Sequence, residues 1–224
     1  MAKTILLSRE TLGGFDPKYW YTAQFIRSRS ITSVLDVGCR DGILHEAIHA
    51  EGIDRENFRY LGVDLSQNEA NTVEYVCDVT SGIPVEAASY DLVVALDLLE
   101  HLDNFQAGLD ELDRVARRYI IVSLPNMAHF FFRFRFLLTG QINSKYELSY
   151  GYGLDRHRWF TILPQTNVYF STYCKERSYV LEQLYLSLGG RRLPTVERLF
   201  RLLGFRSAWY TWAVLYVIEK MTPT

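Results

Sequence analysis

The feature that most constrains the fold is a short apolar run that ends in a glycine turn and continues as a helix. Residues Ser33–Val37 have the pattern of a buried strand, Gly38 and Gly42 bracket the turn, and a helix is expected from Ile43. Glycine has no Cβ and tolerates positive φ, so the backbone of such a turn can approach a ligand closely. A strand that turns directly into a helix is typical of the α/β class.

Apolar runs then alternate with amphipathic stretches along the chain. Asp16 followed by Pro17 predicts the start of a helix that ends near Ser28. Another helix is expected at 104–117, where apolar residues recur at helical spacing. Further strands are expected at 59–63, 73–76, 90–96, 119–124 and 213–219. The pattern predicts one α/β domain with a mostly parallel sheet and helices on both faces.

A chain of 224 residues can bury the core of one mid-sized domain. We expect a helical cap at 1–30, a ligand-binding core at 31–126, an aromatic and basic lid or acceptor region at 127–193, and a helix and final strand at 194–224. The formal net charge is −2, but residues 127–206 hold 12 Lys and Arg against 5 Asp and Glu. This excess favours an anionic substrate or surface, and a solvated face is the plain alternative.

The three cysteines, Cys39, Cys77 and Cys174, are widely spaced and form no CxxC pair. Neither a disulfide framework nor a structural zinc site is predicted. No stretch reaches 18 uncharged apolar residues, and the first ten residues lack a secretory signal. We therefore expect a cytoplasmic protein without a transmembrane segment.

Several predicted strands end beside a carboxylate, where the loops of a parallel sheet converge on ligands. Asp64 follows the second strand of the core and could bind a ribose diol, because its two oxygens can accept from two adjacent hydroxyls. Capping of the following helix is the alternative. Asp78 could accept from an adenine amino group, with Val79 against the ring. The spacing GxxxG, rather than GxGxxG, disfavours a dinucleotide.

Four segments in series, VLDVGCRDG, YLGVDLS, CDV and YDLVVALDLLEHL, resemble the class I S-adenosylmethionine-dependent methyltransferases over about residues 30–126. The resemblance implies S-adenosylmethionine as cofactor. It also places the cofactor-binding residues: Asp36, Gly38, Cys39, Arg40, Gly42, Asp64, Leu65, Asp78, Val79 and Leu96. Arg40 departs from the family, which has glycine there, so its side chain points to solvent or reaches the cofactor carboxylate. SLPN, RFRFLLTG and DRHRWF are similar to the MetW-type branch, which is associated with methionine biosynthesis.

Methyl transfer to a hydroxyl benefits from a general base, and histidine is the natural candidate. The resemblance places His101 near the methyl group, His157 falls in the expected lid, and Asp97 is a third candidate catalytic residue. Capping or orienting the loop is the alternative role of His101. Asp97, Glu100 and His101 are also similar to a metal-binding arrangement of some quinone-pathway O-methyltransferases, although our assignment includes no metal.

Residues 127–139, with five Phe and interleaved Arg133 and Arg135, have three interpretations: a roof over the acceptor, core with snorkelling arginines, or a membrane-contacting surface. Nucleic acid is disfavoured as substrate, since ALDLLEH replaces the motifs of the DNA methyltransferases. We therefore expect an enzyme that methylates a small metabolite or glycan, most readily at oxygen, and the basic region favours an anionic acceptor. The alternatives are a cofactor-binding accessory subunit and a peripheral membrane enzyme with a lipidic acceptor.

Overall fold

The computed structural model describes residues 3–5, 14–53, 56–69, 71–146, 156–186 and 193–221. The strands in this part of the chain form one sheet in the order β1-β7-β8-β6-β5-β2-β3-β4, in which only β8 runs antiparallel to its neighbours. The strands are β1 (Lys3–Ile5), β2 (Ser33–Val37), β3 (Arg59–Asp64), β4 (Tyr75–Val76), β5 (Tyr90–Leu96), β6 (Ala116–Pro125), β7 (Val180–Leu186) and β8 (Ala213–Glu219).

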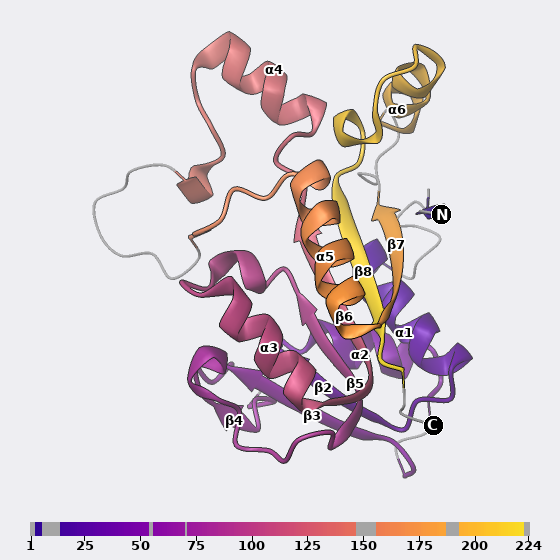
Figure 1. Cartoon of the computed structure of the whole chain (residues 1–224), viewed down its shortest axis with the longest axis vertical. Coiled ribbons are helices and arrows are strands. Elements are labelled where there is room, and N and C mark those ends of the chain that lie inside the picture. Colours follow the sequence, from indigo (N-terminus) through magenta and orange to yellow (C-terminus); the bar gives the residue numbers. More distant parts are fainter. Residues whose placement is uncertain are drawn as a thin grey trace.

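Helices cover both faces of this sheet, as Figure 1 shows. The helices are α1 (Pro17–Ser28), α2 (Ile43–Ala50), α3 (Phe105–Val115), α4 (Phe130–Thr139), α5 (Leu163–Arg177) and α6 (Leu193–Leu202). Helices α1 and α2 share one hydrophobic cluster with the sheet, and α3 and α5 share the other. Helices α4 and α6 stand together at one end of the molecule (Figure 1). The predicted α/β fold is confirmed.

The central strands are buried on both faces because successive side chains enter opposite hydrophobic layers. In β2, Val34 packs in the layer of α1 and α2, whereas Leu35 and Val37 pack in the layer of α3 and α5. In β6, Ile121 packs in the layer of α1 and α2, and Ile120 packs in the layer of α3 and α5. The unbroken apolar runs of the sequence therefore correspond to strands with helices above and below.

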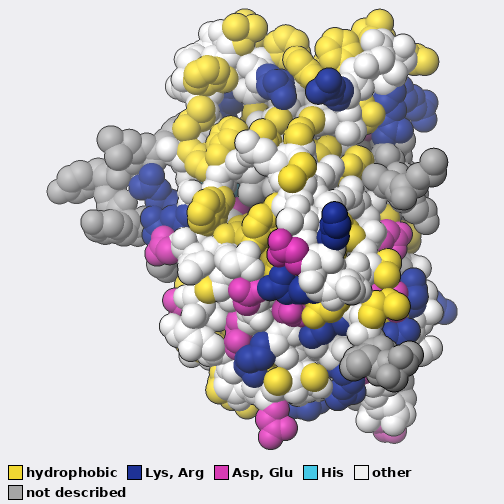
Figure 2. Space-filling model, in the orientation of Figure 1, with side chains coloured by type: hydrophobic (Ala, Val, Ile, Leu, Met, Phe, Trp, Pro, Cys, Tyr) yellow, Lys and Arg dark blue, Asp and Glu magenta, His cyan; other side chains and the backbone are white. Residues whose placement is uncertain are grey.

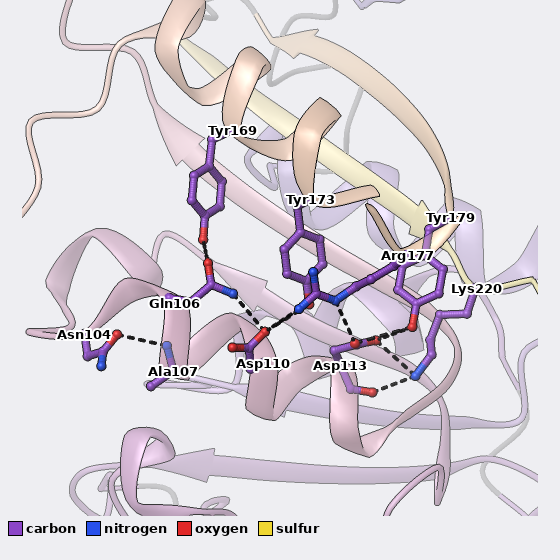
Figure 3. A network of polar contacts seen from close by, with 10 residues as sticks. All are labelled: Asn104, Gln106, Ala107, Asp110, Asp113, Tyr169, Tyr173, Arg177, Tyr179 and Lys220. Carbon is purple, nitrogen blue, oxygen red and sulfur yellow. Dashed lines mark hydrogen bonds and ion pairs between the residues drawn. The ribbon is translucent and has the colours of Figure 1, made fainter. Parts of the chain in front are cut away.

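Polar contacts clamp α5 onto α3 at the outer edge of this layer (Figure 3). Arg177 on α5 donates to Asp110 on α3 at 3.1 Å. Asp113, one turn further along α3, accepts from the Tyr179 hydroxyl at 3.1 Å and pairs with the Lys220 ammonium at 3.0 Å. Because Lys220 follows β8, three elements distant in sequence meet at Asp113. The clamp fixes the position of α5 and of the segment that precedes it.

Most of the predicted core elements have the expected bounds, with three differences. Strand β4 is only Tyr75–Val76, shorter than the predicted 73–76. Helix α3 ends at Val115 rather than 117, because Ala116 has extended φ and ψ of −69° and 128° and pairs with Tyr90. Strand β6 therefore begins three residues earlier than predicted.

The expected lid at 127–193 is too long. It contains α5, which covers the sheet, and β7, which is one of its strands. Helix α5 buries Thr166, Phe170, Tyr173 and Cys174, a polar and aromatic mixture that hides the helical periodicity in the sequence. Of the expected lid, 147–155 and 187–192 lie outside the described residues, and the domain bounds stay a prediction. Within the described chain, no helix has the length and apolar character needed to cross a bilayer.

Candidate functional site

The site lies where the chain reverses its direction of travel across the sheet. From β2 the chain moves outward to β3 and β4, then returns to β5 on the other side of β2. Strands β2, β3 and β5 are parallel, so their carboxyl ends share one edge. Such a switch point leaves a crevice outside the strand ends, where ligands of open α/β sheets bind.

The glycine turn after β2 is held against β3 by the backbone. The amides of Gly38 and Cys39 donate to the Val63 carbonyl at 2.8 and 3.2 Å. Gly38 and Gly42 have φ of +77° and +74°, values that favour glycine. Gly62 is required for packing, since a Cβ there would lie 2.8 Å from the Cys39 sulfur and 2.9 Å from the Thr72 carbonyl oxygen. The turn is therefore rigid and lies close to the strand ends.

Arg40 takes part in this turn through its backbone. Its amide donates to Asp64 Oδ2 at 2.8 Å, and its carbonyl accepts from the Asn68 side chain. The Leu65 amide donates to Asp64 Oδ1 at 2.7 Å. Arg40 has φ of +46°, and its side chain is exposed. Each Asp64 oxygen keeps acceptor capacity beyond its one backbone partner, as a bound diol would need.

Asp36 is almost fully buried at the end of β2, where it faces the Tyr60 hydroxyl. Tyr60 donates to Asp36 Oδ2 at 2.6 Å. Burial raises the pKa of Asp36 to about 7, and the nearby Asp64 carboxylate acts in the same direction, against the hydrogen bond from Tyr60. A cation in the crevice would favour the charged form of Asp36.

The other predicted cofactor-binding residues have mixed surroundings. Burial raises the pKa of the Cys39 thiol to about 12, so this side chain is an uncharged thiol at pH 7. Leu65 is exposed. Asp78 lies beside Asp64, since the preceding Cys77 amide donates to the Asp64 carbonyl at 2.9 Å, and its Oδ1 caps Thr80. The side chains of Val79 and Leu96 are buried in the two hydrophobic cores, which leaves their backbone to face a ligand.

Asp97, a predicted catalytic residue, is an ion-pair partner in this structure. Its carboxylate pairs with the Lys18 ammonium of α1 and accepts from the Ser123 hydroxyl. Burial opposes ionisation, but Lys18 and Ser123 together lower the pKa of Asp97. Asp97 also has φ of +54°, a strained value for a non-glycine residue. The pair attaches the first helix to the end of β5.

Glu100, His101 and His157 form a compact cluster next to this pair. One ligand-type atom from each lies within 4.8 Å of the others, and His157 Nε2 is 4.0 Å from Glu100 Oε1. Glu100 is fully buried, and neither carboxyl oxygen has a hydrogen-bond partner in the described part of the chain. Burial and the nearby Asp97 raise the pKa of Glu100 well above its usual range.

In both histidines, a hydrogen bond at Nδ1 fixes the orientation of the imidazole ring. His101 Nδ1 lies 3.1 Å from the Arg156 carbonyl, to which it can only donate. The Tyr146 hydroxyl donates to the Trp159 carbonyl at 2.7 Å and lies 3.0 Å from His157 Nδ1, from which it accepts. Both imidazoles therefore carry a proton on Nδ1, and His157 Nε2 lies on the side of Glu100. Metal-binding histidines have this arrangement, and so do histidines that act as bases.

Three residues of the site, Lys18, Tyr60 and Tyr146, could not be predicted from the sequence. Lys18 follows the helix start Asp16-Pro17, but its role depends on where α1 docks. Tyr60 is inside a strand, where an aromatic residue predicts only burial. The proximity of His157 to Glu100 depends on the segment at 156–161, whose Arg158 amide donates to the Glu100 carbonyl at 2.8 Å. No local sequence signal predicts these tertiary contacts.

An apolar cavity of about 400 Å³ lies beneath α4. Met127, Phe132, Phe136, Phe160 and Ile162 are among the residues that line it. Phe132 and Phe136 are one turn apart on α4, so one side of this helix covers the cavity. The interpretation of 127–139 as a roof over the acceptor stays a prediction.

A family profile described as a methyltransferase domain matches residues 21–182, well over half of the chain. Among curated proteins, none matches the sequence.

Three solved structures illustrate the shared fold at low sequence identity. The small RNA methyltransferase HEN1 has a TM-score of 0.60 at 18% identity over 92% of this chain, which spans 25% of that chain. A SAM-dependent methyltransferase from Archaeoglobus fulgidus gives 0.55 at 15% identity, covering 95% of this chain and 97% of that one. The plantazolicin methyltransferase BpumL, in complex with a triazolic desmethylPZN analog and SAH, has a TM-score of 0.56 at 13% sequence identity. The match covers 91% of this chain and 83% of that one.

Proposed function

Because this chain belongs to the class I S-adenosylmethionine-dependent methyltransferases, we propose that it transfers the methyl group to a hydroxyl oxygen of a small acceptor. Oxygen is proposed as the acceptor atom because of the cluster of Glu100, His101 and His157. A hydroxyl is a weak nucleophile until its proton is removed, whereas an amine or a thiolate needs less help. A buried acid beside two histidines whose Nδ1 protons are held by backbone and hydroxyl oxygens suits that task.

The rigid turn and the strand-end acids support the assignment of the cofactor-binding residues. We place the adenosyl ribose at Asp64, whose oxygens are already oriented by the Arg40 and Leu65 amides. The methionine ammonium and sulfonium would lie near Asp36, where positive charge is favourable. The adenine would lie by Asp78 and the Val79 backbone. The methyl group then faces the carboxyl end of β5, beside Asp97 and the cluster.

The cluster fits a divalent cation. Glu100 offers a carboxyl oxygen that has no hydrogen-bond partner in the described chain and that would lose its proton on binding a cation, and His101 and His157 offer imidazole nitrogens. Mixed oxygen and nitrogen ligands suit Zn²⁺, Mn²⁺ or Fe²⁺ better than Mg²⁺ or Ca²⁺. A bound cation would lower the pKa of a hydroxyl that contacts it. The residues themselves orient the acceptor and exclude water.

Without a cation, His101 is the candidate base. Its Nδ1 proton is held by the Arg156 carbonyl, so Nε2 can take the hydroxyl proton while the imidazolium stays hydrogen bonded. The Asp97 carboxylate, whose pKa is lowered, would then favour the imidazolium through its negative charge. The two mechanisms differ in their response to chelation, which abolishes turnover only if a cation is required.

The acceptor itself is not selected by the fold, which supports many chemistries. The plantazolicin enzyme and HEN1 share the fold although their names state very different substrates. The apolar cavity beneath α4 favours an acceptor with an apolar portion, whose hydroxyl would reach the cluster. The predicted MetW-type accessory subunit is the second candidate, and it predicts cofactor binding without turnover.

The test is incorporation of a tritiated methyl group from S-adenosylmethionine into fractions of a metabolite extract and, separately, into RNA. We expect label in an apolar small-molecule fraction, a fall of about 100-fold or more in His101→Ala, and no change in the exposed control Glu86→Gln. Label only in RNA would overturn the small-molecule assignment. Stoichiometric cofactor binding with no label in any fraction would favour the accessory subunit.

A further inference from the structure

Helices α4 and α6 carry a continuous set of exposed apolar side chains. On α4, Phe131, Phe134 and Leu138 recur at i, i+3 and i+7, so they share one face, and Leu138 is 79% exposed. This face lies roughly opposite to Phe132 and Phe136, which line the cavity. At the end of α6, Leu202 is 85% exposed, and Leu199, Leu203 and Phe205 are also exposed.

The two helices form one surface because aromatic contacts join them. The Phe130 and Phe200 rings lie 5.1 Å apart between centroids, and Arg133 lies 4.4 Å above the Trp209 ring. Phe132 stacks on Trp212 at 5.1 Å, which anchors α4 to the start of β8. The exposed side chains of α4 and α6 are therefore held as a fixed pair. We call the exposed residues of 131–138 and 199–205 the apical surface.

The segments around the apical surface are strongly basic. Residues 126–146 and 193–212 contain six cations, Arg133, Arg135, Lys145, Arg198, Arg201 and Arg206. Their one carboxylate is Glu197, which is buried. Figure 2 shows dark blue side chains among the yellow ones at the upper end of the molecule, without magenta there. The remainder of the chain is acidic on balance, so the positive charge is concentrated at this end.

We propose that the apical surface docks on the surface of an anionic lipid bilayer. Exposed Phe and Leu beside arginines, on a helix too short to span, are the features of a helix that lies in the membrane interface. Arginine attracts anionic headgroups, while Phe131, Phe134 and Leu138 would insert among the acyl chains. Clusters of exposed apolar side chains mark sites of interaction with a protein or a membrane. This inference is independent of which acceptor the enzyme methylates.

Charge favours a bilayer over a second copy of the chain. In a twofold dimer through this surface, the arginines of one copy would face the arginines of the other, since both copies present the same patch. No exposed carboxylate in the two described segments would offset that repulsion. An anionic lipid surface supplies the opposite charge and an apolar layer together.

The experiment is flotation of the full chain with vesicles of phosphatidylcholine alone or with about 30% phosphatidylglycerol. We expect binding to the anionic vesicles only. Leu137→Asp/Leu138→Asp should weaken it by about tenfold or more, because two exposed leucines of the apical surface become charged. Arg198→Gln and Arg206→Gln should each weaken it by about fivefold and reduce its salt sensitivity. The matched control is Val168→Asp, on the exposed side of α5 and 67% exposed.

Circular dichroism of each variant establishes that it is folded. Loss of binding in the α4 variant with retention in the Val168 variant supports the proposal. Equal binding by the wild type and Leu137→Asp/Leu138→Asp, or no binding to either vesicle, overturns it. A third outcome is that the wild type dimerises, that it does not bind vesicles, and that the α4 variant abolishes the dimer. This outcome overturns the proposal and assigns the apical surface to contact with a second copy.

Discussion

The Lys18 ammonium on α1 pairs with the Asp97 carboxylate at the end of β5. This ion pair connects a helix outside the expected cofactor-binding core to the loop that leads into the cluster of Glu100, His101 and His157. Ser123 on β6 donates to the same carboxylate, so three elements share one acceptor.

Removal of Lys18 should destabilise the fold through Asp97. Lys18→Met leaves a half-buried carboxylate without its cation, and we expect a loss of about 1–2 kcal/mol in the free energy of unfolding, after allowance for solvent screening. Adding Asp97→Asn to Lys18→Met should recover most of that loss. A double-mutant cycle in urea measures the coupling. Additive effects would mean that the pair contributes nothing to stability.

Glu100→Gln should impair methyl transfer without lowering the free energy of unfolding. The buried carboxyl has no hydrogen-bond partner in the described chain, so its replacement by a neutral amide should leave the free energy of unfolding unchanged or raise it by about 1 kcal/mol. Methyl transfer should fall by about 100-fold or more, since the cluster loses its anionic ligand. Chemical denaturation and turnover are measured on one preparation, with Glu86→Gln as control. A variant that loses stability and keeps activity would show that Glu100 has a structural role.

The buried Asp36 makes stability depend on pH. In the unfolded chain it ionises near pH 3.8, and in the folded chain near pH 7. Between these values the folded state holds the extra proton, so this residue lowers the free energy of unfolding as pH rises, by on the order of 4 kcal/mol in total. Asp36→Asn should therefore gain stability relative to wild type from pH 4 to pH 7, and no further above pH 8. Urea unfolding at four pH values measures the difference, and a constant difference would contradict the assigned shift.

Arg40→Gly tests the departure from the family's glycine. Arg40 contributes its backbone to Asp64, and its side chain is exposed, so cofactor affinity should change by less than about threefold. Glycine removes the cost of φ at +46°, and we expect stability to change by about 1 kcal/mol or less. Titration calorimetry decides the first point. A tenfold loss of affinity would mean that the guanidinium contacts the cofactor.

Much of the fold could be predicted because its signals are local. The run Ser33–Val37, the positive-φ glycines and the cap at Asp16 each depend on the backbone preferences of a few neighbouring residues. Helix α5 and strand β7 could not be predicted in this way. Helix α5 buries Thr166 and Tyr173 beside Phe170, and the Tyr216 hydroxyl satisfies the Thr166 hydroxyl at 2.6 Å. Its burial depends on a partner 50 residues away.

In the candidate site, too, some residues follow from local sequence signals and others depend on distant contacts. Asp36 and Asp64 are recognisable because each ends a strand, and parallel strands end at a common edge. The partners of Asp97, Glu100 and His157 come from a helix and a loop whose docking no short segment encodes. Sequence therefore predicted the candidate residues, whereas the ion pair with Lys18 and the orientation of both imidazoles required the structure.

The central claim is that the strand-end acids bind an adenosyl cofactor, and calorimetric titration with S-adenosylhomocysteine tests it most directly. The account predicts one site per chain in the wild type and in Glu86→Gln. It predicts a loss of affinity of about tenfold or more in Asp64→Asn, because one charge-assisted acceptor of the ribose is removed. Absence of binding by the folded wild type, or equal affinity in Asp64→Asn, would contradict it.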